Sequence, residues 1–325
     1  MLKKVLVALA ILLTVVTITL WACVKLGAFN VSREKLITRY ALPQSQWLDL
    51  DGAQVHVVDE GEGPAIVLIH GHFMNLRLWD DWARILSQKF RVIRYDRSPY
   101  GLSGDDPAGY HMDRQIEQLS RLLDALGVER ATLVGTSSGG INAFRFAARY
   151  PERVEHLVLI NSGGLPRPPV NPLTAPPANP LRAWLFRHYR PRSELEKTVK
   201  RSLAPGTEPP DWLVDQYYQM NRRRGANAGI ASLLASYDPG NPAETLAKVR
   251  APTLVMWGLD NQLLPHTEAD QFAQFMTGAP VVVKKFPGAG HLAIVELAEQ
   301  LAEEVARFLE HPREGAESLA EATSE

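Results

Sequence analysis

Residues 131–139 read ATLVGTSSG, a short apolar run followed by the pentapeptide Gly135-Thr136-Ser137-Ser138-Gly139. A G-x-S-x-G pattern between a strand and a helix is typical of a nucleophile elbow, a sharp turn that exposes the serine hydroxyl. The glycines remove Cβ atoms where the backbone must turn tightly. Because a serine hydroxyl is a weak nucleophile, the pattern predicts catalysis only where a base and an oxyanion site accompany it.

Strand and helix patterns alternate on both sides of this stretch. After strand-like segments from residue 46, apolar strand patterns occupy 65–69, 91–95, 131–134, 154–160, 253–257 and 281–286. Helical patterns cover about 76–88, 112–126, the segment from the elbow to 150, and 292–309. This alternation predicts an α/β fold with a mostly parallel sheet flanked by helices.

The alternation stops between the sixth and the seventh predicted strand. Prolines crowd residues 166–180 and forbid regular structure there, and helix-capable segments follow near 181–204, 211–224 and 226–236. We therefore expect a core made of residues 46–164 and 251–310, with a helical cap at 165–250. Residues 26–45 read as a linker, and the acidic end at 311–325 is predicted to be disordered.

The bulk composition excludes several classes of protein. The chain has 325 residues, 46% hydrophobic and 22% charged, which is ordinary for a globular protein. A formal net charge of −1 gives no electrostatic reason to expect a nucleic-acid partner. Cys23 is the only cysteine and zinc-type spacings are missing, so the sequence predicts no disulfide, metal or cofactor.

The N-terminus departs from this soluble profile. Residues 5–24 carry no charge, and twenty residues at helical rise match the hydrocarbon thickness of a bilayer. Signal-peptide apolar regions are usually shorter, so we expect residues 1–25 to be a single-pass membrane anchor, with a cleaved signal as the second interpretation. Lys3 and Lys4 before the span favour an inside N-terminus and a periplasmic catalytic domain.

His291 is the histidine best placed to serve as a base. It follows the last predicted strand in the turn sequence Pro287-Gly288-Ala289-Gly290-His291 and opens the final helix. Ligands of open α/β sheets bind at such strand ends. The order of serine, then acid, then histidine along the chain is the order found in α/β-hydrolases.

With these motifs the chain resembles the α/β-hydrolase fold family, in particular capped serine hydrolases similar to meta-cleavage-product hydrolases and membrane-anchored monoacylglycerol lipases. The resemblance rests on IHGHF at 69–73, YDRSPYGLS at 95–103, the elbow, and GAGH at 288–291. It implies an oxyanion hole formed by the backbone N–H groups of His72 and Ser138. It also implies that His70 serves packing and that Asp96 braces the loop beside the site.

The acid is where the chain departs from the family pattern. The segment after the seventh strand in relatives resembles Trp-Gly-x-x-Asp-x-x-x-Pro, whereas residues 257–265 read WGLDNQLLP. Asn261 therefore stands at the expected position and Asp260 one residue earlier. We expect Asp260 to reach His291 through a one-residue shift. The alternatives are Asn261 as an uncharged partner or another carboxylate such as Asp238.

Together these residues predict a membrane-anchored serine hydrolase that cleaves a carboxylic ester. Ser137 attacks the carbonyl, His291 takes its proton, Asp260 orients His291, and the N–H groups of His72 and Ser138 hold the oxyanion. The anchor and an aromatic-rich cap favour a lipid ester such as a monoacylglycerol. Two alternatives remain: a carbon–carbon bond hydrolase of the meta-cleavage-product type, and a catalytically silent binding protein.

Overall fold

The computed structural model describes residues 1–166 and 191–311. The prolines after Pro166, the start of the helix-capable segment near 181–204, and the predicted disordered tail beyond residue 311 lie outside the described residues.

A sheet of eight strands forms the centre of the molecule, in the order β1-β2-β4-β3-β5-β6-β7-β8. The strands are β1 (Gln46–Leu50), β2 (Ala53–Glu60), β3 (Ala65–Ile69), β4 (Arg91–Tyr95), β5 (Ala131–Thr136), β6 (Val154–Ile160), β7 (Thr253–Gly258) and β8 (Val281–Phe286). The β1–β2 and β2–β4 pairs are antiparallel, and the remaining pairs are parallel. The predicted mostly parallel sheet is thus confirmed.

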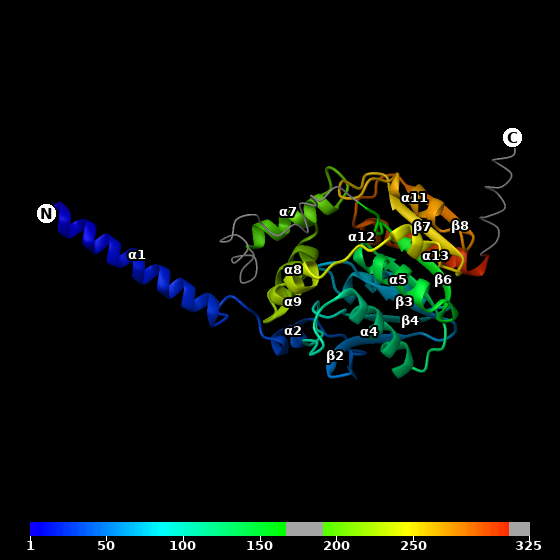
Figure 1. The fold of residues 1–325 in the computed structure, drawn as a ribbon, viewed down its shortest axis with the longest axis horizontal. Helices are drawn as coiled ribbons and strands as arrows, with labels where there is room; N and C mark the ends of the chain where they lie inside the picture. Colours follow the sequence, from blue (N-terminus) through cyan, green and yellow to red (C-terminus); the bar gives the residue numbers. More distant parts are fainter. Residues whose placement is uncertain (167–190, 312–325) are drawn as a thin grey trace.

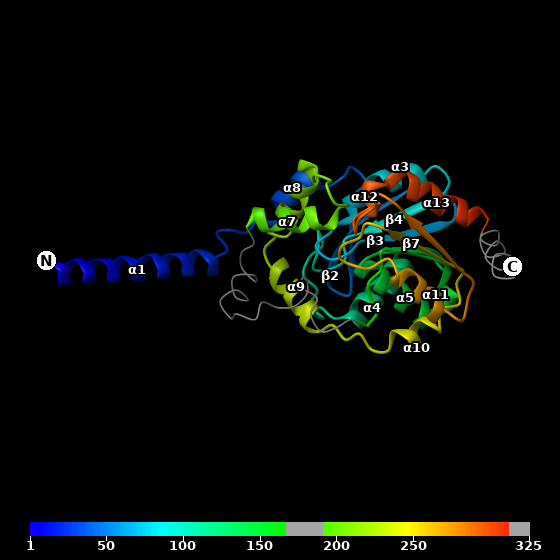
Figure 2. The same ribbon diagram turned by 90° about the horizontal axis from the view of Figure 1, so that it is seen from above.

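Helices cover both faces of the sheet (Figure 2). One face carries α3 (Asp80–Leu86), α12 (Ala293–Glu296) and α13 (Ala298–Glu310), and the other carries α4 (Met112–Ala125), α5 (Ser138–Arg149) and α11 (Glu268–Phe275). Strand side chains alternate between the two cores: Ile66 and Leu68 join the first, Val67 and Ile69 the second. Continuously apolar strands such as β3 are the expected result of burial on both faces.

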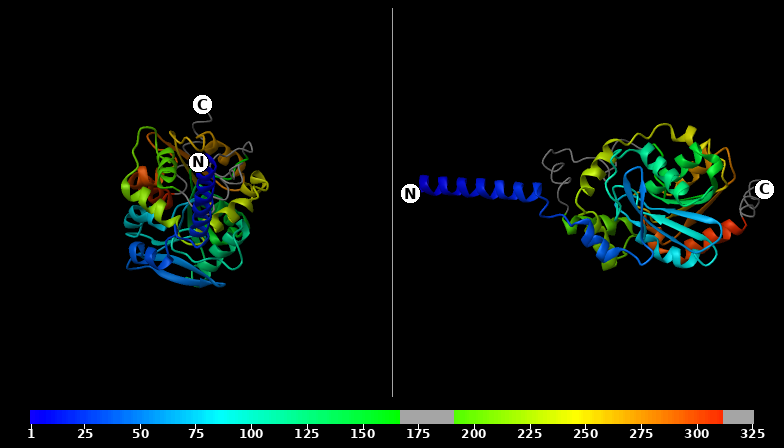
Figure 3. Two further views of the ribbon diagram at one scale, coloured as in Figure 1. Left: turned by 90° about the vertical axis from the view of Figure 1, so that its left-hand side faces the viewer. Right: turned by 90° about the horizontal axis from the view of Figure 1, so that it is seen from below.

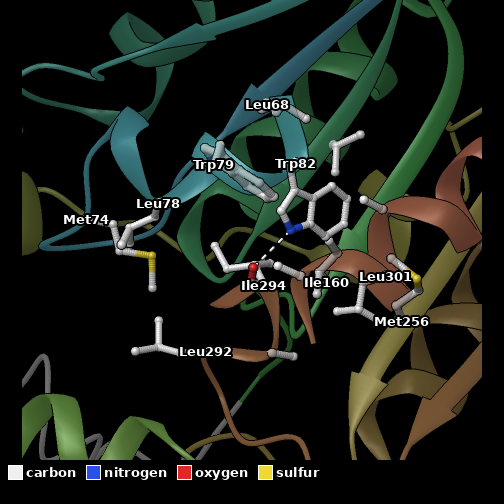
Figure 4. Packing of buried hydrophobic residues seen from close by; sticks show 14 of the residues in the cluster. Leu68, Met74, Leu78, Trp79, Trp82, Ile160, Met256, Leu292, Ile294 and Leu301 are labelled. Atoms are coloured by element: carbon white, nitrogen blue, oxygen red, sulfur yellow. Dashed lines mark hydrogen bonds between the residues drawn. The ribbon is translucent and has the colours of Figure 1, made fainter. Parts of the chain in front are cut away.

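Trp82 of α3 joins the first core to the chain that leads into α13 (Figure 4). Its indole N–H donates to the carbonyl of Ile294 at 2.9 Å, and the side chain is fully buried. Buried indole N–H groups need such a partner. The bond therefore holds α12 and α13, the helices that follow His291, against the sheet.

Two predicted helices differ in detail from the structure. The helix expected at 76–88 begins as a 3₁₀ turn, η1 (Leu76–Trp79), and α3 ends at Leu86. The final helix is interrupted at Leu297, whose φ of −125° is not helical, so α12 and α13 are separate. Helical periodicity survives a one-residue break, which is why the pattern did not reveal it.

A helical insertion lies between β6 and β7, as predicted. Its described helices are α7 (Arg192–Ser202), α8 (Asp211–Met220), α9 (Ala226–Ala235) and α10 (Pro242–Leu246). The sequence did not predict α10, a five-residue helix that begins at a proline and is capped by Asn241, whose side chain accepts from the Glu244 N–H. Leu203, Leu213 and Tyr217 are buried in the same cluster as Trp82, so the insertion packs on the core.

The N-terminal helix α1 (Leu2–Lys25) projects away from the rest of the molecule (Figures 1 and 3). The span Leu2–Val24 is long and apolar enough to cross a membrane, and an 18-residue window of it has a mean hydropathy of 2.6 and no buried residue. The helix is thus a candidate transmembrane helix, by length and composition.

A second short helix, α2 (Arg33–Tyr40), joins this candidate anchor to the folded part. The Arg33 Nε donates to the carbonyl of Leu102 at 2.7 Å, and the Tyr40 hydroxyl donates to Asp215 of α8 at 2.8 Å. The segment predicted as a linker is therefore docked on both the insertion and the loop after β4.

Candidate active site

Ser137 lies at a strained turn between β5 and α5. Its φ of 53° and ψ of −122° are rarely adopted by residues with a side chain. A Cβ at Gly139 would lie 2.1 Å from the carbonyl oxygen of Ile69, and one at Gly135 would lie 2.5 Å from the carbonyl oxygen of Gly139. Only glycine fits at these two positions, which explains the G-x-S-x-G spacing.

The structure brings His291 to Ser137. The loop between β8 and α12, residues 287–292 and called here the histidine loop, places the His291 Nε2 3.0 Å from the Ser137 Oγ. His291 is 7% exposed, so its ring is largely withdrawn from water. This is hydrogen-bond distance, as a serine and its general base require.

The loop after β3, residues 70–75 and called here the oxyanion loop, lies against Ser137. A Cβ at Gly71 would be 2.9 Å from the Ser137 Cβ. Among the described residues, the backbone N–H groups of His72 and Ser138 have no acceptor. Ser138 is also the first residue of α5, where N–H groups are unsatisfied and the helix dipole is positive. The role of these two N–H groups as an oxyanion hole stays a prediction.

The His72 side chain forms part of the pocket wall. Its Nδ1 lies 2.5 Å from the Tyr100 hydroxyl, and burial lowers the pKa of His72 to about 3, so the ring is neutral at physiological pH. A narrow cavity at this point is lined by His72, Arg97, Met112, Gln115, Ser138, Leu233, Leu234 and Tyr237. The cavity joins the predicted oxyanion residues to α9 of the insertion.

Arg97 is a residue of the site that sequence reasoning missed. Its side chain is almost fully buried, and its guanidinium donates to the Gln115 Oε1 at 2.8 Å and to the Ser138 Oγ at 2.9 Å. It thereby fixes the side chain of the residue next to Ser137. A charged residue inside the motif at 95–103, directly after a buried strand, was the available signal.

Asp96 and His70 hold the surrounding loops. Asp96 accepts the backbone N–H groups of Leu76 and Leu102, both at 2.7 Å, and the Nδ1–H of His56 at 2.7 Å. Burial alone would raise the pKa of the Asp96 carboxyl, but His56 holds it below its usual range. The His70 Nε2 accepts the N–H of Arg97 at 3.0 Å. Both side chains brace loops, as the resemblance implied.

The acid side of the site corrects a prediction. The structure does not place Asp260 against His291: the Asp260 side chain is exposed, and its Oδ2 accepts the backbone N–H of Gly288 at 2.7 Å. Asn261 occupies the predicted place of the acid, with its Nδ2 3.3 Å from the His291 Nδ1. No one-residue shift occurs, because the turn after β7 buries Asn261 and turns Asp260 outward. Asp238 caps its own turn at the Gly240 N–H.

Two further residues hold the histidine loop and were not predicted. Asn161, after β6, donates to the carbonyls of Gly290 and His291, both at 3.0 Å, and accepts the Gly258 N–H at 2.9 Å. Glu296 of α12 accepts the N–H of Gly290 at 2.7 Å and that of Ala204 in the insertion at 2.6 Å. Their positions, at a strand end and five residues after His291, were visible in the sequence.

No metal centre emerges from this geometry. Over residues 1–166 and 191–311, no three His, Cys, Asp or Glu side chains come together in a way that could hold a metal ion. Within the described parts of the chain, the chemical groups of the site are a serine, a histidine, the backbone N–H groups of His72 and Ser138, and a buried guanidinium.

Comparison with known proteins identifies the class of fold. The sequence profile of the α/β hydrolase fold matches residues 64–297, more than half of the chain. The match includes the oxyanion loop, the elbow and the histidine loop.

Two curated relatives are hydrolases of similar length. The chain is 29% identical over 263 residues to a 2-hydroxy-6-oxononadienedioate/2-hydroxy-6-oxononatrienedioate hydrolase of Comamonas testosteroni, covering 77% of this chain and 89% of the relative. It is 30% identical over 270 residues to a 2-hydroxymuconate semialdehyde hydrolase of a Pseudomonas species, covering 79% of this chain and 91% of the relative.

A solved structure extends the similarity to the N-terminal region. The crystal structure of a membrane phospholipase A, described as a bacterial virulence factor, superposes with a TM-score of 0.73 at 25% identity, covering 96% of this chain and 99% of that one. The two chains are therefore alike over nearly their whole lengths.

Proposed function

Because the chain belongs to the α/β-hydrolase fold family, we propose that it is a serine hydrolase that cleaves carboxylic esters through Ser137. The carrying observation is the 3.0 Å contact between the Ser137 Oγ and the His291 Nε2 at a strained elbow. Strain of this kind is retained where the surrounding structure holds a reactive side chain in place.

The proposed reaction has two halves. The Ser137 Oγ attacks the ester carbonyl while its proton passes to the His291 Nε2, and the negative oxygen lies between the N–H groups of His72 and Ser138. Each such donor contributes about 3–4 kcal/mol to transition-state stabilisation. The alcohol leaves with the proton from His291. Water then attacks the acyl-enzyme, again through His291, and releases the acid.

The insertion is proposed to cap this site. The N–H of Leu292 in the histidine loop donates to the carbonyl of Ser202 at 2.8 Å, and the Asn221 Nδ2 donates to the carbonyl of Phe73 in the oxyanion loop at 3.1 Å. Ser202 and Asn221 thus contact both loops around Ser137, and we take residues 165–250 as the cap and residues 46–164 and 251–310 as the core. Such a cap limits the access of bulk water to the site, which strengthens the electrostatic interactions within it.

We also propose that α1 anchors the enzyme in a membrane with the catalytic domain on the periplasmic side. The span at Leu2–Val24, Lys3 and Lys4 before it, and the similarity to a membrane phospholipase A support this. A lipid ester such as a monoacylglycerol is then a suitable substrate, because it would reach the cap from the bilayer.

Hydrolysis of a carbon–carbon bond is the second candidate reaction. It is supported by the two curated relatives, which are named for 2-hydroxy-6-oxononadienedioate or 2-hydroxy-6-oxononatrienedioate and for 2-hydroxymuconate semialdehyde. The same serine and histidine would serve either bond, so the discrimination lies in the substrate.

The test uses the full-length protein in detergent micelles with 4-nitrophenyl esters, a monoacylglycerol and a 2-hydroxy-6-oxo-dienoate. We expect ester turnover and covalent labelling by a fluorophosphonate, and loss of both in Ser137→Ala. Labelling with turnover of the dienoate alone would establish the second reaction. A folded protein that neither labels nor turns over any substrate would exclude both.

A further inference from the structure

The side-chain amide of Asn261 has a fixed orientation. Its Oδ1 accepts the backbone N–H of Leu263 at 3.0 Å and that of Leu264 at 3.1 Å. Turning the amide over would set its NH₂ group against these two donors, so both of these bonds would be lost. Asn261 is 8% exposed, so water cannot readily replace the lost bonds. The two oxygen contacts therefore assign which end of the amide faces His291.

The end that faces His291 is a donor. The Nδ2 lies 3.3 Å from the His291 Nδ1, and an amide nitrogen donates hydrogen bonds but does not accept them. The Nδ1 must then be the acceptor. In a neutral imidazole only one nitrogen carries the proton, so the proton resides on Nε2.

This tautomer is the unproductive one. The Nε2 faces the Ser137 Oγ at 3.0 Å, and a general base must present a lone pair there to take the hydroxyl proton. With a proton on Nε2, the imidazole donates to Ser137 instead. Reaction then requires the imidazole proton to move to Nδ1, against the Asn261 NH₂ group.

From this arrangement we infer that Asn261 is a positioning residue that holds His291 in the Nε2–H tautomer and keeps the enzyme in an attenuated state. The inference rests on the proposed serine-hydrolase function. In this state, Asn261 limits the rate at which His291 can take the proton of Ser137.

The surroundings of Asn261 suit a carboxylate without rearrangement. One oxygen of an aspartate at this position would keep the Leu263 and Leu264 N–H bonds, and the other would accept an Nδ1–H from His291. With its proton on Nδ1, the imidazole would present an unprotonated Nε2 to Ser137 as the base. In Ser-His-Asp hydrolases, the reverse change from carboxylate to amide lowers turnover by about 10⁴-fold through the wrong tautomer.

The experiment compares the full-length wild type with Asn261→Asp and with the double variant Asp260→Asn/Asn261→Asp. The double variant has the net charge of the wild type, and an asparagine at 260 can still accept the Gly288 N–H. We expect both variants to raise kcat on a 4-nitrophenyl ester by up to about 10⁴-fold, with little change in KM, and to accelerate fluorophosphonate labelling.

Nitrogen-15 NMR of the histidine ring gives a readout independent of turnover, with the His291 signal assigned through His291→Gln. We expect a protonated Nε2 in the wild type and a protonated Nδ1 in Asn261→Asp. A wild-type Nδ1–H tautomer, or equal kcat and labelling in wild type and folded Asn261→Asp, would overturn the inference while leaving the hydrolase function intact. If neither protein labels or turns over an ester, the proposed function fails, and the NMR signal still decides the tautomer.

Discussion

The two sides of the candidate site follow different rules. On the elbow side, the Ser137 Oγ lies 3.0 Å from the His291 Nε2 at the strained turn between β5 and α5. On the acid side, the loop after β7 presents Asn261 to His291 at 3.3 Å, while Asp260 bonds to Gly288. An amide and a carboxylate are nearly the same size, so the backbone tolerates either. The backbone of this loop therefore does not by itself determine whether an amide or a carboxylate faces His291.

The largest expected effect is a loss of stability when alanine replaces a glycine that packs against backbone, on either the elbow side or the acid side of the site. A Cβ at Gly139 would lie 2.1 Å from the Ile69 carbonyl oxygen, and one at Gly258 would lie 2.3 Å from the Ala289 carbonyl oxygen. Alanine at either position should lower the free energy of unfolding by about 1–3 kcal/mol or more, because backbone must shift. Urea denaturation measures it.

The control for these glycines is Gly127, which has a φ of +65° and nothing within 4 Å of a built Cβ. Gly127→Ala should cost about 1–2 kcal/mol from backbone conformation alone. If Gly139→Ala strongly lowered the free energy of unfolding and Gly258→Ala did not, the backbone on the acid side would be less constrained than the backbone on the elbow side.

Glu296 tests whether the histidine loop depends on the insertion. A glutamine at 296 has one acceptor oxygen for two N–H groups, those of Gly290 and Ala204, so one of them loses its partner. We expect kcat to fall about tenfold, in line with the cost of an unsatisfied buried donor. Glu299→Gln, on the exposed surface of α13, is the matched control and should leave kcat unchanged.

Glu296→Gln should also change how the stability of the protein depends on pH. Burial raises the pKa of the Glu296 carboxyl above its usual 4.5. Glu296 therefore contributes stability that is fully present below about pH 4.5 and is lost as the pH rises through its pKa in the folded protein. Between these two values the wild type should lose stability relative to Glu296→Gln in thermal unfolding. Parallel curves for the two proteins would contradict this sign.

The smallest effect is expected at Asp260. Its carboxylate is exposed and accepts one N–H, that of Gly288, which an asparagine could also bond. Asp260→Asn should change kcat on an ester by no more than about twofold, the scale of ordinary surface substitutions. A loss of several orders of magnitude would restore Asp260 as the acid and remove the distinction between the two sides of the site.

The sequence predicted those parts of the molecule that local patterns dictate. Strand and helix alternation determined the fold class, and the G-x-S-x-G spacing placed Ser137 because only glycine fits around it. The helix break at Leu297 escaped, since one residue in a non-helical conformation leaves the apolar periodicity intact.

Other features depend on contacts between distant segments. Glu296 bonds to Ala204, 92 residues away in sequence, and Arg97 bonds to Ser138, 41 residues away. No local pattern encodes these pairs. The choice between Asp260 and Asn261 likewise depended on which side chain the turn after β7 buries. Counting residues along the family motif pointed to Asn261, whereas the need for a carboxylate favoured Asp260.

Asn161 ties the site together mechanically. One amide side chain bonds to the end of β7 through Gly258 and to the histidine loop through the carbonyls of Gly290 and His291, while its own backbone N–H bonds to Met256. The hydrogen bonds of one buried residue, Asn161, thus connect three chain segments. We expect these segments to open as one cooperative unit in hydrogen exchange, with the amides around His291 exchanging only when the ends of β6 and β7 also open.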